Sequence, residues 1–543
     1  MPKLFLFAIG GTGERVLRSF TMLLASGVPT FDNYEIYPII IDYDNKNKDK
    51  VRTVELLQNY AAIHQAAFTR HGKSSDLRTQ PGQFFAAKLT NLTGLENYVF
   101  PFHPANNNEK FSDHIGYGKL SGENDTLATQ QLLKSLYDES DRADTELNLD
   151  MSVGFRGNPN IGSVVFHTIS STDEFTNFTS RFQPAAGDKV TIIGSLFGGT
   201  GASGIPEIAK AINAKKADAR IATILVLPYF APAEREGGAI KASRFNSKTK
   251  AALSYYDVSG LMDKIDKVYY VGDPYPTVVP YCEGGEGQKN NANLVELIAS
   301  IMIEHYVDGR DANRKEFKFS LPTSIVVRNG QRNGQRLFMY DFDNMSIERV
   351  LKHLVELAIA LKLFNDEIKS GKAKDKDFYK YINLKNVIEV EGNDAQKDND
   401  ALRKLCQSLD IFYNKYHEWL KELDYEGNGD AEPANSHRFA LCDMTRNYSN
   451  IILKEAKRPI EKESKLFKKQ MQDLANYFLR NNHKLDANYL LTRMNCHIKD
   501  DMKGNGHYDT KTNQLREGHE PEWVLADILH LSAIDGLNQL VSY

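Results

Sequence analysis

The first half of the chain alternates short apolar runs with longer stretches in which apolar residues recur at helical spacing. The short runs are typical of buried strands, and the longer stretches are typical of helices packed against them. We expect strands at residues 4–9, 36–41, 163–169, 190–193, 221–227 and 267–271, and helices at residues 14–25, 51–69 and 292–307. Because strands that alternate with helices usually pair in parallel, the pattern predicts an α/β fold with a mostly parallel sheet flanked by helices.

Two regions depart from this alternation. Between about residues 94 and 150 the sequence is polar and rich in turn residues, with one helical stretch at 128–137, and we interpret it as an insertion that decorates the sheet. The last third is mainly helical after two short strands, with expected elements at residues 317–327, 336–342, 347–368, 402–423 and 451–479. We therefore predict a sheet-containing unit at residues 1–310 and a C-terminal region of short strands and then helices at residues 311–543.

The segment after the expected strand at 190–193 has the composition of an anion-binding turn. Gly198, Gly199, Thr200 and Gly201 stand between an apolar run and a helix-forming stretch. Glycines remove the Cβ atoms that keep a backbone away from a ligand, and Thr200 adds a hydroxyl donor. The unpaired N–H groups at a helix start also attract negative charge. The segment predicts a polyphosphate site, with a glycine turn that holds no ligand as the alternative.

A second turn of the same design ends the first strand. Gly10, Gly11, Thr12 and Gly13 lead directly into a helical stretch. A dinucleotide site would favour the spacing G-x-G-x-x-G, but Val16 occupies the third glycine position, so that fingerprint is incomplete.

Two more segments belong to the same edge of the predicted sheet. Asp42 and Asp44 follow the strand at 36–41, where carboxylates meet a ribose or a metal-bound water, or simply cap a turn. A third glycine-rich segment, residues 154–162, includes Asn158. Because loops after successive parallel strands lie on one side of the sheet, we expect the three turns to line one crevice. The motif GxxxxGK[ST] does not occur in the sequence, which disfavours a P-loop enzyme.

Composition limits which cellular compartment and which binding partners we expect for the protein. The chain is 41% hydrophobic and 25% charged, which is typical of globular proteins, and its net charge of −4 argues against nucleic acid as a partner. Four cysteines without CxxC spacing fit reduced thiols in a cytosol. The apolar N-terminal run is too short for a secretion signal, and apolar stretches stay below the roughly 18 residues of a membrane helix. We expect a cytoplasmic protein without a membrane span.

Taken in order, the motifs resemble those of the tubulin superfamily, which includes the bacterial cell-division homologue and other prokaryotic tubulin-like proteins. Residues 197–203 resemble its signature G-G-G-T-G-[ST]-G at the core and depart from it at both ends. Residues 10–13 are similar to its first phosphate loop, residues 154–162 resemble the G-x-x-x-G-N-P-x-x-G loop, and residues 228–230 resemble a later Pro-Phe turn. The resemblance covers about residues 3–330.

The resemblance implies roles for residues around a long central helix. Asn291, at the start of that helix, would contact the guanine ring, with a helix cap as the alternative. In the family, acidic residues after the helix complete hydrolysis at the nucleotide of the next subunit. The nearest candidates are Asp308 and Asp311, but the motif N-x-D-x-x-D is not clean here, so solvated turn charges are the alternative. The family's E-G-x-x-R appears only distantly, at Glu236 and Gly237.

On this resemblance we expect a guanine-nucleotide-binding protein that takes GTP or GDP with Mg²⁺ and self-assembles head to tail into filaments, with GTP hydrolysis completed between subunits. One alternative is a non-hydrolysing nucleotide-binding scaffold or sensor that engages a protein partner through its helical C-terminal region. Another is a Rossmann-type oxidoreductase. The dispersed His483, His497 and His507 predict no metal site, and the charges of residues 454–469 predict a solvated helix face.

Overall fold

The computed structural model describes the chain except residues 45, 69–80, 102–109, 121–123, 138–145, 170, 216–218, 236–239, 275, 321–326, 329–330, 333–336, 339–344, 389–399, 426–438, 443, 445–485, 500–505, 510, 513, 517–518 and 542–543. The described residues form a six-stranded parallel sheet in the order β2-β1-β3-β4-β6-β8. Its strands are β1 (Lys3–Ile9), β2 (Glu35–Ile41), β3 (Lys189–Ser195), β4 (Arg220–Val226), β6 (Lys267–Gly272) and β8 (Glu316–Ser320). The predicted α/β class is confirmed.

Helices cover both faces of the sheet, and the side chains of β1 show why. Successive residues of a strand point to opposite faces. Leu4 and Leu6 enter one apolar core, and Phe5 and Phe7 enter the other. The first core is covered by α1 (Gly10–Ala25), α2 (Lys48–Phe68) and α9 (Leu294–Asp308), and the second by α5 (Pro159–Ile169), α6 (Asp173–Arg181), α7 (Gly199–Lys215) and α8 (Phe245–Val258).

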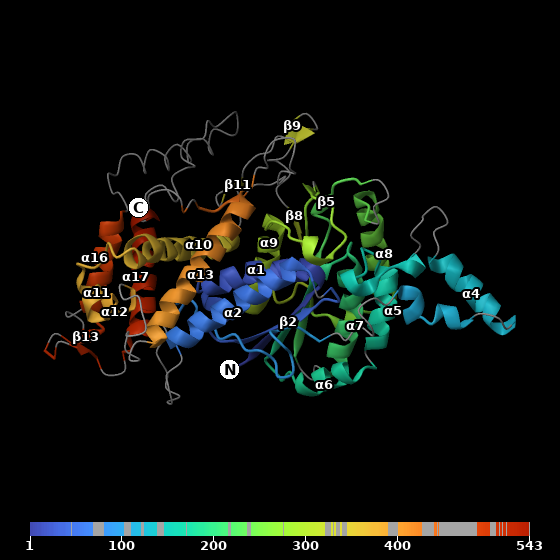
Figure 1. The fold of residues 1–543 in the computed structure, drawn as a ribbon, viewed down its shortest axis with the longest axis horizontal. Helices are drawn as coiled ribbons and strands as arrows, with labels where there is room; N and C mark the ends of the chain where they lie inside the picture. The colour runs from blue at the N-terminus through green and yellow to red at the C-terminus, as the bar shows by residue number, and fades with distance from the viewer. Residues whose placement is uncertain are drawn as a thin grey trace.

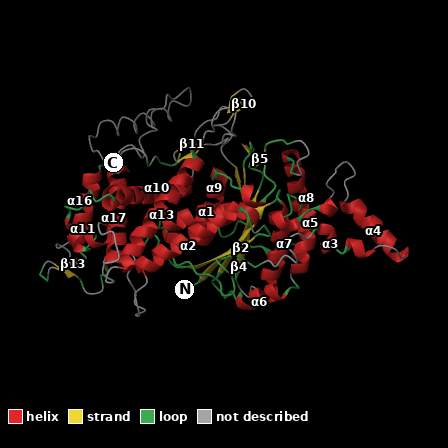
Figure 2. Cartoon of the chain, in the orientation of Figure 1, coloured by secondary structure: helices red, strands yellow, loops and turns green. Residues whose placement is uncertain are grey.

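The helical C-terminal region packs beside α1 and α2, away from α5 to α8 (Figure 1). Its apolar side chains join those of α1, α2 and α9 in one continuous core, so the region docks on the sheet-containing unit through buried surface. Figure 2 shows this part as helices joined by loops. Its helical elements are α10 (Met345–Leu363), the π-type turn η10 (Phe364–Lys369), α11 (Asp377–Tyr381), α12 (Lys385–Ile388), α13 (Asp400–Leu423), α16 (Ala487–Lys499) and α17 (Pro521–Val541).

The remaining elements are short. The expected helix at 128–137 lies within α4 (Asn124–Tyr137), which extends from the edge of the molecule in Figure 1. Short strands and helices are β5 (Phe230–Pro232), β7 (Thr277–Val279), β9 (Val327–Arg328), β10 (Gln331–Arg332), β11 (Leu337–Phe338), β12 (Phe439–Ala440), β13 (Tyr508–Asp509), β14 (Gln514–Leu515), α3 (Phe111–His114) and α4 (Asn124–Tyr137). Single 3-10 turns are η1 (Pro29–Phe31), η2 (Tyr117–Leu120), η3 (Glu146–Asn148), η4 (Met151–Val153), η5 (Ala242–Arg244), η6 (Met262–Lys264) and η7 (Gly285–Gly287).

Two expectations need correction. Residues 163–169 are the second part of α5, not a strand. Pro159 occupies the first position of the helix, and Ile161, Val165 and Phe166 recur at helical spacing in the second core, so burial overrides the β-branched composition. The sheet also continues past residue 310, because β8 pairs with β6 as its edge strand. The expected strand at 317–327 overlaps β8, and residues 321–326 and the stretch 451–479 lie outside the described residues.

The strand order changes direction at β1. The chain runs outward from β1 to β2, then returns to β3 on the other side of β1 and continues outward through β4, β6 and β8. The helix after β1 lies on one face, whereas the helix after β3 lies on the other. In parallel α/β sheets this reversal opens a crevice outside the carboxyl ends of the two strands, and ligands bind there.

Candidate functional site

A pocket lies at this reversal, where β1 and β3 end side by side. α1 begins at Gly10 directly after β1, and α7 begins at Gly199 shortly after β3. Both helices therefore direct unpaired N–H groups and the positive ends of their dipoles toward the pocket, an arrangement that attracts an anion. The turn residues that line it are Gly10, Gly11, Thr12, Gly198, Gly199, Thr200 and Gly201.

The third glycine-rich segment completes the pocket, as the sequence predicted. Gly154 and Gly157 line it, and both have positive φ angles, of 77° and 73°, which glycine adopts without strain. A Cβ on Gly199 would lie only 3.2 Å from the backbone nitrogen of Asn158, so the two turns are in close backbone contact. Asn158 itself is buried behind the lining, where its N–H donates to the carbonyl of Phe155 at 2.8 Å.

Some of the predicted glycines serve the packing of the turns rather than access for a ligand. A Cβ on Gly201 would lie 2.6 Å from the carbonyl oxygen of Ser195. Gly13 does not line the pocket, and a Cβ there would lie 2.8 Å from the backbone of β1, so this glycine lets α1 sit against the sheet. At Gly11 a Cβ would meet only the ends of flexible side chains, with Nε2 of Gln288 at 2.7 Å.

Asp42 and Asp44 line the pocket, and both are almost fully buried. Asp42 accepts a long hydrogen bond from the hydroxyl of Thr200 at 3.5 Å and another from Asn47 at 3.3 Å. Burial raises the pKa of Asp42. Asp44 accepts the backbone N–H of Gly285 at 2.6 Å. The two carboxylates thus tie the loop after β2 to the turns around it.

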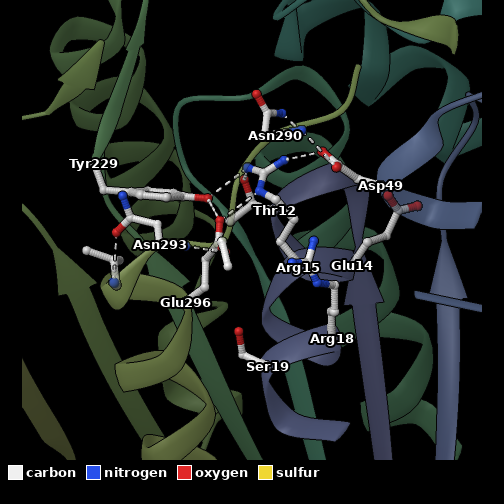
Figure 3. Close-up of polar contacts among 12 residues, drawn as sticks. Thr12, Glu14, Arg15, Arg18, Ser19, Asp49, Tyr229, Asn290, Asn293 and Glu296 are labelled. Atoms are coloured by element: carbon white, nitrogen blue, oxygen red, sulfur yellow. Dashed lines mark hydrogen bonds and ion pairs between the residues drawn. The ribbon is translucent and has the colours of Figure 1, made fainter. Parts of the chain in front are cut away.

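A buried arginine that the sequence analysis did not single out organises the wall of the pocket. Arg15 lines the pocket and is 3% exposed. Its guanidinium donates to Glu296 at 2.7 Å, to Asp49 at 3.0 Å, and to the hydroxyls of Tyr229 and Thr12 at 2.7 and 3.3 Å (Figure 3). It joins α1, α2, α9 and the turn after β4. The buried charge is therefore a structural centre of the site.

The sequence did contain a signal for this centre. Glu14, Arg15 and Arg18 stand at the start of an otherwise mainly apolar helical stretch. In the structure every residue of that helix, α1, except Gly11 is buried. Charges in a helix without a polar face must find partners inside the protein. Burial raises the pKa of Glu14, and the neighbouring Asp42 raises it further. This group lies just beneath the pocket, where Asn47 donates to it at 3.0 Å.

The asparagines before α9 have different environments. Asn290 lines the pocket, whereas Asn291 is exposed and is not among the lining residues. Asn293 caps α9, with its side chain accepting from the N–H of Val295 at 2.9 Å while Glu296 accepts from the N–H of Asn293 at 3.0 Å. Asn291 therefore neither lines the pocket nor caps α9.

Asp308 and Asp311 lie at the opposite end of α9. The helix has 15 residues, so its two ends are about 22 Å apart at 1.5 Å per residue. Lys189, the first residue of β3, donates to the carbonyl of Val307 at 2.6 Å, which places this end at the amino edge of the sheet. Asp308 pairs with Arg310 at 2.7 Å, and Asp311 lies 3.4 Å from Nε2 of His305. The turn that carries Asp308 and Asp311, called the acidic turn below, is therefore not part of the pocket.

Several other expectations concern metals, membranes or segments that the structure leaves undescribed. Glu236, Gly237, His483 and residues 454–469 lie outside the described residues. His497 and His507 bond to Asp535 and Asp527, each at 2.7 Å. Within the described part of the chain, no group of three or more side chains is suited to hold a metal ion. A search of the same residues finds no helix with the length and apolar character needed to cross a membrane.

Comparison with known proteins adds little to this picture. No protein-family model matches the chain, and no curated protein matches it. Among solved structures, the chain is similar to CetZ2 from Haloferax volcanii, described as a GTPgS-bound protofilament, with 12% sequence identity and a TM-score of 0.25. The match covers 57% of this chain and 59% of that one, which is less than two thirds of its length. At this score the likeness carries no weight for function, which must be argued from the pocket.

Proposed function

We propose that the pocket binds the phosphates of a guanine nucleotide and that the chain is a tubulin-like protein that assembles head to tail. The observation that supports this most directly is the convergence of three glycine-rich turns and two helix N-termini on one crevice. Backbone N–H groups held in this way bind a phosphate without any basic side chain. A polyphosphate is the ligand that would use both helix ends at once.

We choose guanine because the order of the motifs in the sequence resembles that of the tubulin superfamily. The pocket also has side chains that suit a nucleotide base. Beside the glycine turns, Phe230, Gln288 and Asn290 also line the pocket. An aromatic ring can stack on a base, and side-chain amides both donate and accept hydrogen bonds. We assign the base to this side of the pocket, with Asn290 in the place that the sequence suggested for Asn291.

Magnesium, if it accompanies the nucleotide, would be bound mainly by the phosphates. The carboxylates that line the pocket are Asp42, Asp44 and Glu283, and each already accepts hydrogen bonds within the protein. Three carboxylates are fewer ligands than the ion takes, so phosphate oxygens and water would have to supply the rest. The metal would offset charge on the phosphates.

The positions of the pocket and the acidic turn support head-to-tail assembly. They lie at opposite edges of the sheet, so stacking one subunit on the next in the same orientation would bring Asp308 and Asp311 toward a neighbouring pocket. A heterologous contact of this kind builds an open filament. In this proposal the acidic turn positions or deprotonates water for hydrolysis only in the assembled state.

A second function, nucleotide binding without turnover, is favoured by the arginines around the acidic turn. Glu304 is fully buried and pairs with Arg310 and Arg349, and Asp308 pairs with Arg310. Carboxylates that are held in ion pairs are poorer bases. In this version the chain is a scaffold or sensor that reports on nucleotide through its helical C-terminal region.

The experiment is to titrate the purified chain with GTP, GDP, ATP and NADH in the presence of Mg²⁺ and to measure binding by calorimetry and assembly by sedimentation. We expect GTP and GDP to bind and GTP to cause pelleting with release of phosphate. Binding without pelleting or phosphate release would favour the scaffold. Binding of NADH alone would favour an oxidoreductase, and binding of none of the four would overturn the proposal.

A matched pair of variants tests the location of the site. Gly11→Val adds bulk at the pocket, where it displaces only the ends of flexible side chains, whereas Gly118→Val adds the same bulk where nothing lies within 4 Å. We expect Gly11→Val to weaken nucleotide binding by at least about tenfold, equivalent to 1.4 kcal/mol, and Gly118→Val to leave it unchanged. Equal affinities for both variants would place the nucleotide elsewhere.

A further inference from the structure

The last turn of α13, in the C-terminal region, reaches the outer side of the pocket wall. Glu422 is 7% exposed and forms ion pairs with Arg18 of α1 and Arg52 of α2. It also accepts the backbone N–H of Ala292 at 2.9 Å. One carboxylate from the C-terminal region thus joins two helices of the sheet-containing unit to the segment that leads into α9.

That segment forms part of the pocket. Asn290 lines it, and its carbonyl accepts a hydrogen bond from Arg52 at 3.2 Å. The backbone and side-chain nitrogens of Asn290 both donate to Asp49 at 3.0 Å, and Asp49 pairs with Arg15 (Figure 3). Contacts therefore run without a gap from Glu422 through Arg52 and Asn290 to the buried arginine of the pocket.

Glu422 belongs to α13, so Arg18 and Arg52 keep this ion-pair partner only while α13 is docked. Arg18 is buried, and a buried cation that loses its partner is strongly destabilising. Burial raises the pKa of Glu422, but Arg18 and Arg52 outweigh that effect and lower it, so the carboxylate is ionised at neutral pH. One turn earlier, Trp419 is fully buried and its indole donates to Ser19 of α1 at 3.4 Å.

We propose that Glu422 is a positioning residue through which the C-terminal helical region holds the base-side wall of the pocket, so that nucleotide binding and docking of α13 stabilise each other. This inference rests on the proposed function for its ligand. Because coupling between two sites is reciprocal, a nucleotide that needs the ordered wall must also tighten α13 against α1 and α2.

The test compares Glu422→Gln with Glu418→Gln by hydrogen exchange, first without nucleotide. Glu418 lies one turn earlier on α13 and approaches Arg52 and Lys289, each at 3.5 Å, but its side chain is 49% exposed, so these ion pairs contribute little. We expect Glu422→Gln to speed exchange of the amides at residues 290–293 by about tenfold, within the usual range of coupling energies, and Glu418→Gln to leave it unchanged. Equal exchange in the two variants would overturn the positioning role.

The second arm adds GTP and GDP and asks whether the two regions respond together. In the unmodified chain we expect nucleotide to slow exchange in α13, and we expect that response and the nucleotide affinity to fall in Glu422→Gln. Arg52→Gln, which removes a partly exposed partner, repeats the test if Glu422→Gln does not fold. Nucleotide that binds without altering exchange in α13 would refute the coupling. A chain that binds no nucleotide but shows the effect at residues 290–293 would refute only the proposed function.

Discussion

The two ends of α9 carry acidic side chains, but the protein uses them differently. At the N-terminal end, the negative charge of Glu296 interacts favourably with the positive end of the helix dipole. Its side chain is buried against Arg15 beside the pocket. At the C-terminal end, Glu304 and Asp308 oppose the negative end of the dipole, and Arg310 and Arg349 offset their charge. One end therefore lies beside the pocket, and the other presents an acidic turn to solvent.

The difference shows that an acidic residue near a helix of the site is not by itself evidence of a catalytic role. Glu296 and Glu304 are both buried and both paired with arginine, so the charge of each is offset within the protein. Asp308 and Asp311, in contrast, have partly exposed side chains that a neighbouring subunit could approach. The proposed catalytic role of the acidic turn depends on assembly, whereas the pocket is formed within one chain.

The largest expected effect comes from comparing two of the arginines that pair with these buried glutamates, Arg15 and Arg349. Arg15→Met leaves Glu296 and Asp49 buried without their cation, and we expect it to cost about 3–5 kcal/mol of unfolding free energy. Arg349→Met removes a half-exposed partner while Glu304 keeps Arg310, so we expect a cost of about 1 kcal/mol or less. Urea unfolding of both variants measures the difference, and similar losses would mean that the two ends are equally important for stability.

Substitutions at the acidic turn test whether the exposed end takes part in hydrolysis. Asp308→Asn and Asp311→Asn should leave nucleotide affinity intact, because both residues lie far from the subunit's own pocket. In assembled protein we expect phosphate release to fall at least about tenfold, below the usual contribution of a general base. Asp263→Asn, an exposed carboxylate elsewhere, serves as the control. Unaltered turnover in both acidic-turn variants would remove the catalytic assignment.

The buried carboxyl beneath the pocket predicts a pH dependence of stability. Burial raises the pKa of Glu14 in the folded protein, whereas in the unfolded chain this carboxyl ionises at about pH 4.3. Above that pH the unfolded state loses a proton that the folded state retains, so stability falls as pH rises toward the folded pKa. We expect Glu14→Gln to lose less stability between about pH 5 and pH 8 in urea unfolding. Glu55→Gln, on the surface of α2, is the control, and parallel profiles for Glu14→Gln and the unmodified chain would contradict the prediction.

The smallest expected effect distinguishes the asparagines that precede α9. Asn293→Ala removes a capping side chain and should cost about 1 kcal/mol of unfolding free energy. Asn291→Ala alters an exposed side chain and should change stability by less than about 0.5 kcal/mol. Nucleotide titration of the same variants sharpens the assignment, because loss of affinity in Asn291→Ala would restore the base contact that the sequence suggested.

Much of the pocket could be predicted from the sequence because its parts are local. The turns at Gly11 and Thr200 each follow a strand closely, and the carboxyl ends of parallel strands share one edge, so these two turns could be expected together. The lining position of Asn290 could not be predicted, because Asn290, Asn291 and Asn293 are equally suitable by residue type for a cap or a ligand contact. Residues 163–169 also misled the prediction, since their β-branched composition favours a strand where burial produces a helix.

The order of apolar and polar positions by itself determined the α/β class, the parallel sheet and the glycine turns, because these follow from periodicity and from neighbours along the chain. Only the tertiary structure decided how the buried charges are satisfied. Arg15 meets Glu296, 281 positions away, and Arg18 meets Glu422, 404 positions away. A charge buried in a helix must find a partner, but which partner it meets depends on how distant helices pack.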